Sequence, residues 1–412
     1  MSARFWRPMV LCVLLVAGAC GGNNSSTKTA SGTPTTAASG SNATTNDKPI
    51  VIGVAYGASG WLVPFDTPSL AGLKIAVDDV NAAGGVNGRK LKVIESDTKS
   101  DPAQAVKSAH QLIDDGAEVL VVSCDFDAAS PAALVAQDKK IVTFSLCAVS
   151  PKFGVQGIGD MAYTVSIAAQ AEGAVLATFA IQQGWKTGFA LIDDSIAIGK
   201  DGCSGFKQSF TAQGGKIVGE ATFKNSDTSI ASQVSQIRSA GAAVIADCSY
   251  IPGGVSAMRQ IRAAGIASPI VAGGSMDGAY WTKATPGLND YYVATMASVF
   301  GDSPNADVNR FTKRFAEVTG AAPLNQTGAI GYSVGQAIAK AITRAGGSTS
   351  GTALRDVLNK FKDEPLLIGP TSFDAKTHIV VNRPMEILKY VNAVPGYITS
   401  VKQATQVDLG LG

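Results

Sequence analysis

The sequence predicts an α/β protein made of two doubly wound parallel-sheet lobes. Short apolar runs bounded by turn residues alternate with helical segments, and such runs are typical of buried parallel strands. The alternation occurs twice, which favours two lobes over one very large sheet, and the roughly 365 residues that follow position 47 suit two domains. The expected strands are residues 51–56, 90–96, 117–123 and 141–146 in the first lobe and 188–193, 216–223, 242–248 and 269–273 in the second.

The stretch 76–106 is the most informative part of the chain. A helix is expected to end at Gly84-Gly85, where the second glycine can adopt the left-handed conformation that a β-carbon disfavours. Strand 90–96 follows, and Asp101-Pro102 then predicts a second helix with Asp as N-cap and Pro at the first helical position. Helix, turn, strand, loop and helix form one half of a parallel α/β sheet. The apolar face of the first helix consists of Leu70, Leu73, Val77 and Val80.

This stretch resembles the type I periplasmic binding proteins, in particular the branched-chain amino acid receptors. In that family a D-x-x-N-A-x-G-G-x-x-G segment followed by D-x-x-x-D-P marks the N-terminal lobe. Here Asn81, the two glycines, Asp97 and Asp101-Pro102 fall in register. The family's C-terminal pattern is matched as well, so the likeness spans nearly all of residues 48–390. The segments that carry it are 311–323, 328–347 and 366–378.

The resemblance implies two lobes joined by a three-stranded hinge. Ligands of doubly wound sheets bind beyond the carboxyl ends of the strands, so two facing lobes place the pocket between them. The crossings between lobes are expected near residues 164–167, 294–299 and 374–384. We therefore expect an N-terminal lobe of residues 48–165 plus 298–377 and a C-terminal lobe of residues 166–297 plus 378–412.

The N-terminus predicts a secretory lipoprotein. Arg4 and Arg7 precede a short apolar run and small residues, the order found in signal peptides, and the run is too short to span a bilayer. The segment LVAGAC resembles a bacterial lipobox with Cys20 as the acylated residue, although Ala17 stands where Leu is usual. The alternative is a plain signal peptide with an incidental cysteine. We expect residues 1–19 to be the signal peptide and residues 20–47, rich in Gly, Ser, Thr and Asn, to be a lipid-anchored flexible linker.

The charge balance argues against a nucleic-acid partner. Removal of residues 1–19 takes away Arg4 and Arg7 and no acidic residue, so Lys+Arg falls from 34 to 32 against 32 Asp+Glu. A mature chain near neutrality favours neither nucleic acid nor a polybasic membrane surface. Membrane contact is expected only through the lipid, outside the cytoplasm, and the protein is expected to be a monomer.

Four cysteines are expected to form two disulfides. Cys12 leaves with the signal peptide, and an even number of thiols in an oxidising compartment indicates pairing. Three connectivities are possible, but the expected topology favours Cys124–Cys147 and Cys203–Cys248, each pair lying on neighbouring elements of one lobe. Each pair should stabilise the fold by about 3–4 kcal/mol. Metal binding is the competing interpretation, but no CxxC spacing occurs, so no metal is expected.

Three aromatic residues in strand-end loops are candidates for ligand contact. Trp61 and Phe65 lie in a Gly/Ser/Pro-rich loop that has no helix or strand face for them to fill. Tyr250 directly follows strand 242–248, and both Phe65 and Tyr250 match positions where the family places an aromatic beside its ligand. The alternative for each is packing under its own turn or between the lobes.

Other candidate positions follow from the family's ligand-binding loops. Asp277, after GGS, matches a carboxylate that amino-acid receptors keep for the ligand's ammonium; a solvated loop Asp or a helix N-cap is the alternative. Where the family offers serine hydroxyls to an amino-acid carboxylate, Asp125 or Phe126 aligns here, and Val149, beside Ala148, lies near a usual threonine; the alternative is that Ser145 or Ser150 substitutes with a one-residue shift. Ile198 stands where an aromatic is usual, and the helix after Asp125 is expected to open at Ser130-Pro131. These departures favour a more cationic, amide-like or aromatic ligand over leucine, isoleucine or valine.

A binding function is favoured over catalysis. No nucleophile-elbow, P-loop or dinucleotide motif follows any strand, and His110 and His378 occupy unrelated places. We expect an extracytoplasmic solute-binding lipoprotein that captures a small polar molecule, such as an amino acid or amide, and delivers it to ABC permease subunits. It should need no cofactor. The alternatives are an ectodomain that feeds a membrane sensor and a receptor for an aromatic or amine ligand.

Overall fold

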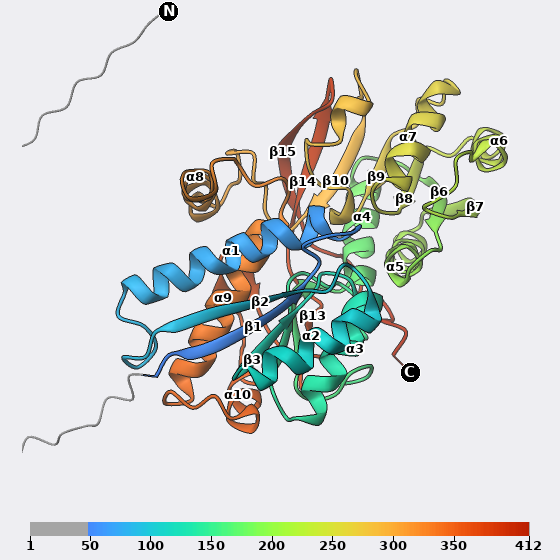
Figure 1. Ribbon diagram of the computed structural model, residues 1–412. Helices are drawn as coiled ribbons and strands as arrows, with labels where there is room; N and C mark the ends of the chain where they lie inside the picture. The colour runs from blue at the N-terminus through green and yellow to red at the C-terminus, as the bar shows by residue number, and fades with distance from the viewer. Residues whose placement is uncertain (1–47, 412) are drawn as a thin grey trace, which may run out of the picture. The chain divides into compact units, whose positions relative to one another are not determined.

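A computed structural model describes residues 48–411, and the expected signal peptide, Cys20 and linker lie outside the described residues. Within the described part the chain forms two large sheets, each covered by helices (Figure 1). This agrees with the two α/β lobes predicted from the alternation of apolar runs. No helix in residues 48–411 combines the length and apolarity that a membrane crossing requires.

The first sheet is entirely parallel. The strand order is β13-β5-β4-β3-β1-β2. Successive strands are added on one side of β1 and then, from β3 onward, on its other side, as in doubly wound folds. The strands are β1 (Ile50–Tyr56), β2 (Leu91–Asp97), β3 (Val119–Val122), β4 (Thr143–Ser145), β5 (Ala162–Ile167) and β13 (Ile379–Val380).

Helices cover both faces of the first sheet. Alternate residues of β1 point to opposite faces: Ile52 packs with α1 and α9, whereas Val51 packs with α2 and α3. Helix α1 approaches α9 so closely that a β-carbon on Gly72 would lie 1.9 Å from the carbonyl oxygen of Gly328. The helices of this lobe are α1 (Val63–Ala82), α2 (Pro102–Asp114), α3 (Phe126–Asp138), α8 (Ala306–Thr319), α9 (Thr327–Arg344) and α10 (Gly351–Leu358). A small antiparallel pair, β11 (Glu364–Leu366) and β12 (Gly369–Thr371), follows α10.

The second sheet has the order β15-β14-β10-β9-β8-β6-β7. The five strands that come first in the chain, β6 to β10, repeat the order of β1 to β5 in the first sheet. Strand β14 runs antiparallel to both of its neighbours. The expected parallel core is present in the strands β6 to β10, and β14 and β15, which form a tight hairpin, add two antiparallel pairings at its edge. The strands are β6 (Thr187–Asp193), β7 (Lys216–Phe223), β8 (Val244–Cys248), β9 (Ile270–Ala272), β10 (Tyr291–Thr295), β14 (Met385–Val391) and β15 (Val394–Val401). Its helices are α4 (Ala169–Gln182), α5 (Ala197–Ala212), α6 (Ala231–Ala240) and α7 (Gly253–Ala263), with short 3-10 turns η1 (Gly274–Met276) and η2 (Thr282–Ala284).

The stretch 76–106 folds as the sequence predicts. Helix α1 ends at Ala82, and Gly84 and Gly85 both have positive φ; a β-carbon on Gly85 would lie 2.2 Å from the carbonyl oxygen of Arg89. The Asp101 side chain accepts a hydrogen bond from the Gln104 amide and caps α2, whose first residue is Pro102. A helix start and a helix stop can be read here because each depends on a few adjacent residues.

The chain passes between the sheets three times. It leaves the first sheet after Ile167, returns between β10 and α8, and leaves again between Val380 and Met385. Strand β13 belongs to the first sheet, so this sheet extends slightly beyond the boundaries expected at residues 165 and 377.

Both disulfides have the expected connectivity. Cys124 and Cys147, at the ends of β3 and β4, are joined with Cα atoms 4.3 Å apart. Cys203 of α5 is joined to Cys248 at the end of β8, with Cα atoms 5.6 Å apart. Each disulfide closes a loop within one lobe, so neither restricts movement between the lobes.

Candidate functional site

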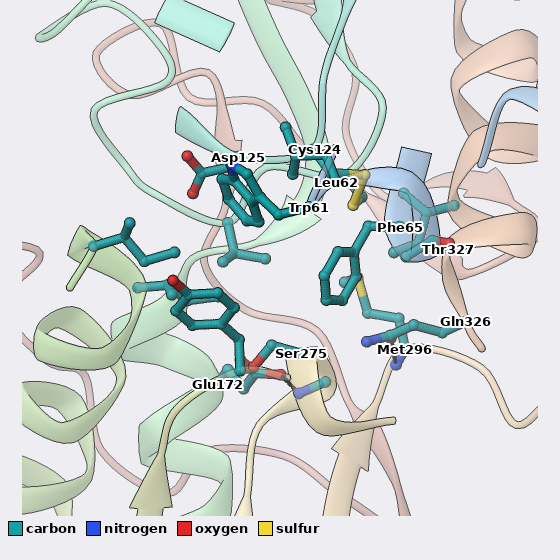
Figure 2. Close-up of a pocket in the computed structure, with 17 residues that line it drawn as sticks. Trp61, Leu62, Phe65, Cys124, Asp125, Glu172, Ser275, Met296, Gln326 and Thr327 are labelled. Atoms are coloured by element: carbon teal, nitrogen blue, oxygen red, sulfur yellow. Dashed lines mark hydrogen bonds between the residues drawn. A yellow bond between two sulfur atoms is a disulfide. The ribbon is translucent and has the colours of Figure 1, made fainter. Parts of the chain in front are cut away.

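A pocket of about 550 Å³, including its open mouth, lies where loops from both sheets meet (Figure 2). First-lobe loops after β1, β3 and β4 face second-lobe loops after β6, β8 and β9. These are the carboxyl ends of parallel strands on both sides of the order reversal, where doubly wound sheets bind ligands. Six residues expected at the site line the pocket: Trp61, Phe65, Asp125, Val149, Ile198 and Tyr250.

The loop that carries Trp61 is held by the segment that follows β2. The Asp97 carboxylate accepts hydrogen bonds from the Ala58 and Ser59 amides, at 3.0 and 3.3 Å, and from the Ser59 hydroxyl at 2.8 Å. The Ser100 hydroxyl donates to the Ser59 carbonyl and accepts from the Leu62 amide. The D-x-x-x-D-P segment therefore does more than start a helix, because it also positions one wall of the pocket.

Two aromatic rings from opposite lobes meet at the pocket. Trp61 follows β1 and Tyr250 follows β8, and their ring centroids lie 5.7 Å apart at an angle of 51°. A second contact between the lobes is made by the Ala197 amide, which donates to the Asp127 carboxylate at 3.3 Å. The two lobes therefore touch directly at two places beside the pocket.

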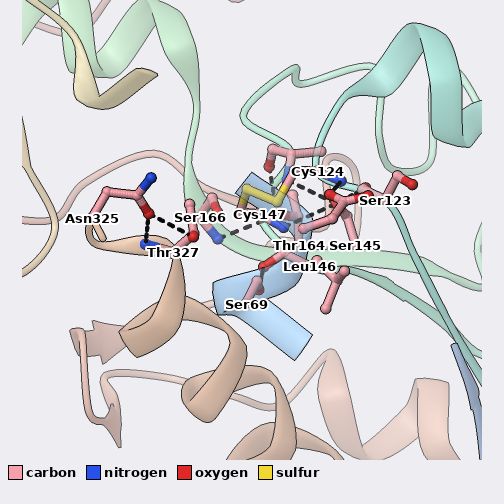
Figure 3. The surroundings of a disulfide bond; sticks show 12 residues. Ser69, Ser123, Cys124, Ser145, Leu146, Cys147, Thr164, Ser166, Asn325 and Thr327 are labelled. Atoms are coloured by element: carbon pink, nitrogen blue, oxygen red, sulfur yellow. Dashed lines mark hydrogen bonds between the residues drawn. A yellow bond between two sulfur atoms is a disulfide. The ribbon is translucent and has the colours of Figure 1, made fainter. Parts of the chain in front are cut away.

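The Cys124–Cys147 disulfide forms part of the first-lobe wall (Figures 2 and 3). The polar groups beside it are turned into the lobe. The Cys124 amide donates to Asp66 at 2.8 Å, and the Cys147 and Ala148 amides donate to the Ser145 hydroxyl oxygen at 3.2 and 2.7 Å. The Ser145 hydroxyl in turn donates to the Ser123 carbonyl. Sulfur, rather than these amides, faces the pocket.

Asp125 lies at the end of β3 and caps helix α3. Its carboxylate accepts a hydrogen bond from the Ala128 amide at 3.0 Å and, in Figure 2, points away from the disulfide. Burial, together with the nearby Asp127 charge, raises its pKa to about 7. Helix α3 starts at Phe126 rather than at Ser130-Pro131, because the Asp125 cap initiates it earlier than the proline would.

Two candidate positions next to these loops do not line the pocket. The early start of α3 places Phe126 on the helix, where it packs against the core beneath α2 and α3. Ala148 is buried in the same core, and its carbonyl accepts a hydrogen bond from the Thr164 hydroxyl at 2.6 Å.

Glu172, which sequence reasoning did not single out, is the buried charge of the pocket. It lies in the first turn of α4 and is 5% exposed. Its Oε1 accepts a hydrogen bond from the Gly274 amide at 2.7 Å, and no described residue donates to its Oε2. Burial raises its pKa to about 7. The side chain is fixed by close helix packing, since a β-carbon on Gly173 would lie 2.1 Å from the Gly202 carbonyl of α5.

Asp277 lies behind the pocket rather than in its lining. It is fully buried after η1, and its Oδ2 accepts hydrogen bonds from the Gln326 amide at 2.8 Å and the Thr295 hydroxyl at 3.2 Å. Desolvation raises its pKa to about 7. Gln326 itself lines the pocket, and its side-chain oxygen accepts from the Met296 amide at 2.6 Å. Asp277 thus connects the second lobe to the start of α9.

The titratable residues of the pocket lining are two carboxyls and one phenol. Asp125, Glu172 and Tyr250 line it, whereas no lysine, arginine or histidine is among the lining residues. His378 is buried elsewhere, stacked on Tyr163 with ring centroids 3.9 Å apart. Burial lowers the His378 pKa to about 4. Among residues 48–411, no cluster of three or more His, Cys, Asp or Glu side chains could hold a metal ion.

Two lobes of this topology with a pocket between them define a ligand-binding protein of the two-lobed receptor class. The chain belongs to the periplasmic binding protein family, whose profile matches residues 49–394. Membership of this family implies a location outside the cytoplasm.

Relatives and solved structures agree with this assignment. The chain is 25% identical over 327 residues to Leu/Ile/Val-binding protein homolog 3 of Brucella melitensis, covering 79% of this chain and 87% of the relative. A leucine-, isoleucine-, valine-, threonine- and alanine-binding protein of Pseudomonas aeruginosa is 23% identical, covering 72% and 79%. The fold is similar to that of the isoleucine-bound branched-chain amino acid transporter substrate-binding protein LivJ from Streptococcus pneumoniae. That similarity has a TM-score of 0.75 at 24% identity and covers 86% of this chain and 100% of LivJ.

Proposed function

We propose that the protein is the solute-binding subunit of an ABC importer and binds a small polar molecule between its lobes. The observation that carries the proposal is the pocket itself, which draws residues from the strand ends of both sheets. The named functions of relatives such as the Brucella melitensis Leu/Ile/Val-binding protein homolog support the transport role.

The mechanism follows from the contacts across the pocket. A ligand that touches both Phe65 and Glu172 interacts with both lobes at once, so it stabilises the closed arrangement more than an open one. The Trp61–Tyr250 contact closes over the same space. The permease can then distinguish the loaded protein from the empty one by the relative position of the lobes.

The expected signal peptide and Cys20 complete the proposal. A lipid on Cys20 would hold a monomeric receptor at the outer face of the membrane, and residues 21–47 would tether it. The role is binding without chemical conversion of the ligand. Metabolic labelling with a palmitate analogue, compared between the wild type and Cys20→Ser, tests the anchor; equal labelling would remove it.

A ligand screen tests the binding function. Amino acids, amides, amines and aromatic acids should include a compound that raises the melting temperature, because ligand binding to the native state stabilises it. The same compound should change tryptophan fluorescence, since Trp61 lines the pocket, and the change should be reduced in Trp61→Phe. A screen without any stabilising compound would contradict the proposal.

A further inference from the structure

We propose, on the basis of the proposed solute-binding function, that the ligand is a small protonated amine with an apolar or aromatic body and no carboxylate, and that Glu172 holds its ammonium group. This deepens the assignment of the pocket by naming the chemical class that it selects.

The first step of the argument is the state of Glu172. Its carboxyl is nearly fully buried in the pocket lining, and only Oε1 accepts a hydrogen bond from a described residue. Burial of the carboxyl disfavours its ionised form, and Oε2, which no described residue bonds and which is not fully buried, is accessible to a ligand in the pocket. An ammonium group supplies both the opposite charge and the N–H donors that Oε2 lacks.

The second step is the opposite wall. A ligand carboxylate needs N–H or O–H donors, yet the amides of Cys124, Cys147 and Ala148 are engaged within the first lobe. The hydroxyl of Thr327, which also lines the pocket, donates to Asn325 Oδ1 at 2.7 Å. Disulfide sulfur and apolar side chains form the rest of this wall, and Asp125 adds a carboxyl that would repel an anionic ligand.

The third step is the body of the ligand. Phe65, Met296, Ile330 and the disulfide provide an apolar surface, and Figure 2 shows Phe65 facing the space that Glu172 borders from the other lobe. The rings of Trp61 and Tyr250 add faces that attract a cation as well as apolar carbon. An amine with a branched aliphatic or phenyl body suits these groups, whereas its amino-acid counterpart adds a carboxylate on the side of Asp125, where the Cys124, Cys147 and Ala148 amides are already engaged.

The test uses ligands that share one carbon skeleton. Isothermal titration calorimetry on the wild-type protein compares isoamylamine, leucinamide, leucine and 4-methylpentanoate, and a second set compares phenethylamine, phenylalaninamide, phenylalanine and 3-phenylpropanoate. In at least one set, the affinity for the amine and for the amide should be at least about tenfold higher than the affinity for the amino acid, and the acids should not bind. In Glu172→Gln the amine should lose about tenfold or more in affinity, since a hydrogen bond to a charged group is lost.

The matched control is Glu220→Gln, which removes an exposed carboxylate on β7 outside the pocket and should leave affinity unchanged. Tighter binding of the amino acids or acids, or full amine affinity in Glu172→Gln, would overturn the amine assignment. If both sets fail while another screened compound stabilises the protein, the amine class is rejected and solute binding stands. If nothing in the full screen binds, the solute-binding function itself is rejected.

Discussion

The pocket and the hinge each contain a buried ionisable side chain, but these side chains differ in charge and in how the surrounding residues bond them. The pocket contains Glu172, a carboxylate with no cation among the described lining residues. The hinge contains Arg383, a fully buried guanidinium that takes part in none of the ion pairs found within residues 48–411. The pocket has a carboxyl with one oxygen that no described residue bonds, and the hinge has a cation that carbonyl and hydroxyl oxygens surround.

Arg383 connects all three crossings between the lobes. It lies in the third crossing and donates to the carbonyl of Val165, close to the first crossing, at 2.8 Å. It also approaches the sulfur of Met296, in the second crossing, at 3.7 Å. Its Nε donates to the Pro370 carbonyl and its Nη2 to the Thr371 hydroxyl oxygen. Burial lowers its pKa to about 9, so it stays charged at neutral pH.

The difference shows which burial is structural and which is functional. The guanidinium is surrounded by fixed carbonyl and hydroxyl dipoles, so its charge is satisfied by the fold itself. Glu172 has one oxygen bonded to the fold and one without a described donor. Met296 belongs to both regions, since it contacts Arg383 and lines the pocket. A ligand against Met296 therefore touches the residue that the hinge arginine holds.

The largest effect is expected from the hinge. Arg383→Ala should lower the free energy of unfolding by about 3–5 kcal/mol, because it leaves buried carbonyls unpaired and opens a cavity. Urea denaturation measures the loss. Arg314→Ala, which removes a half-exposed arginine paired with Asp79, is the control and should cost less than about 1 kcal/mol. If the two variants had similar urea midpoints, Arg383 would not stabilise the hinge.

The next effect concerns the pH dependence of stability at Glu172. Its pKa is raised from 4.5 to about 7 in the folded protein, so the native state binds more protons than the unfolded state between these values. Its contribution is favourable below pH 4.5 and is lost as the pH rises through about 7. One pKa unit corresponds to about 1.4 kcal/mol. Between pH 4.5 and pH 8 the free energy of unfolding of Glu172→Gln should therefore rise by about 2–3 kcal/mol relative to that of the wild type.

Urea denaturation of both proteins across this pH range measures that gain, with Glu220→Gln as the control. The other titratable groups lining the pocket are Asp125 and Tyr250, and both stay unchanged in the comparison. A bound amine should remove the difference at pH 8 by stabilising the wild type alone. If the free energy of unfolding of Glu172→Gln differed from that of the wild type by the same amount at every pH, Glu172 would not be desolvated as the structure indicates.

Much of the fold could be predicted from sequence because its signals are local. Asp101-Pro102 starts α2 through contacts within one helical turn, and the apolar runs identify most strands of both sheets. Trp61 and Tyr250 could be predicted because a strand end in a doubly wound sheet faces the ligand crevice, whereas Phe65, expected in the same loop as Trp61, lies in the first turn of α1. The hairpin of β14 and β15 was missed, since its strands pair at the edge of an existing sheet.

The parts that sequence did not predict depend on long-range packing. Glu172 lies in α4, a nearly continuous apolar segment, and the available signal was that it is the only charged residue between Ala169 and Gln182. Asp277 has a role that depends on the turn η1, which directs its carboxylate toward Gln326 rather than into the pocket. Arg383 meets Val165 across more than two hundred residues of sequence, so no local pattern marks it.

The smallest effect is expected at Asp125, the second carboxyl of the pocket. Asn caps helices about as well as Asp, so Asp125→Asn should change the free energy of unfolding by less than about 1 kcal/mol. Because Asp125 already accepts a bond from Ala128 and points away from the disulfide, amine affinity should fall by only a few-fold, well below the loss in Glu172→Gln. Calorimetry of both variants with the same amine ranks the two carboxyls. A larger loss in Asp125→Asn would move the ammonium site from the second lobe to the first, and the contrast between pocket and hinge would then rest on Asp125 instead of Glu172.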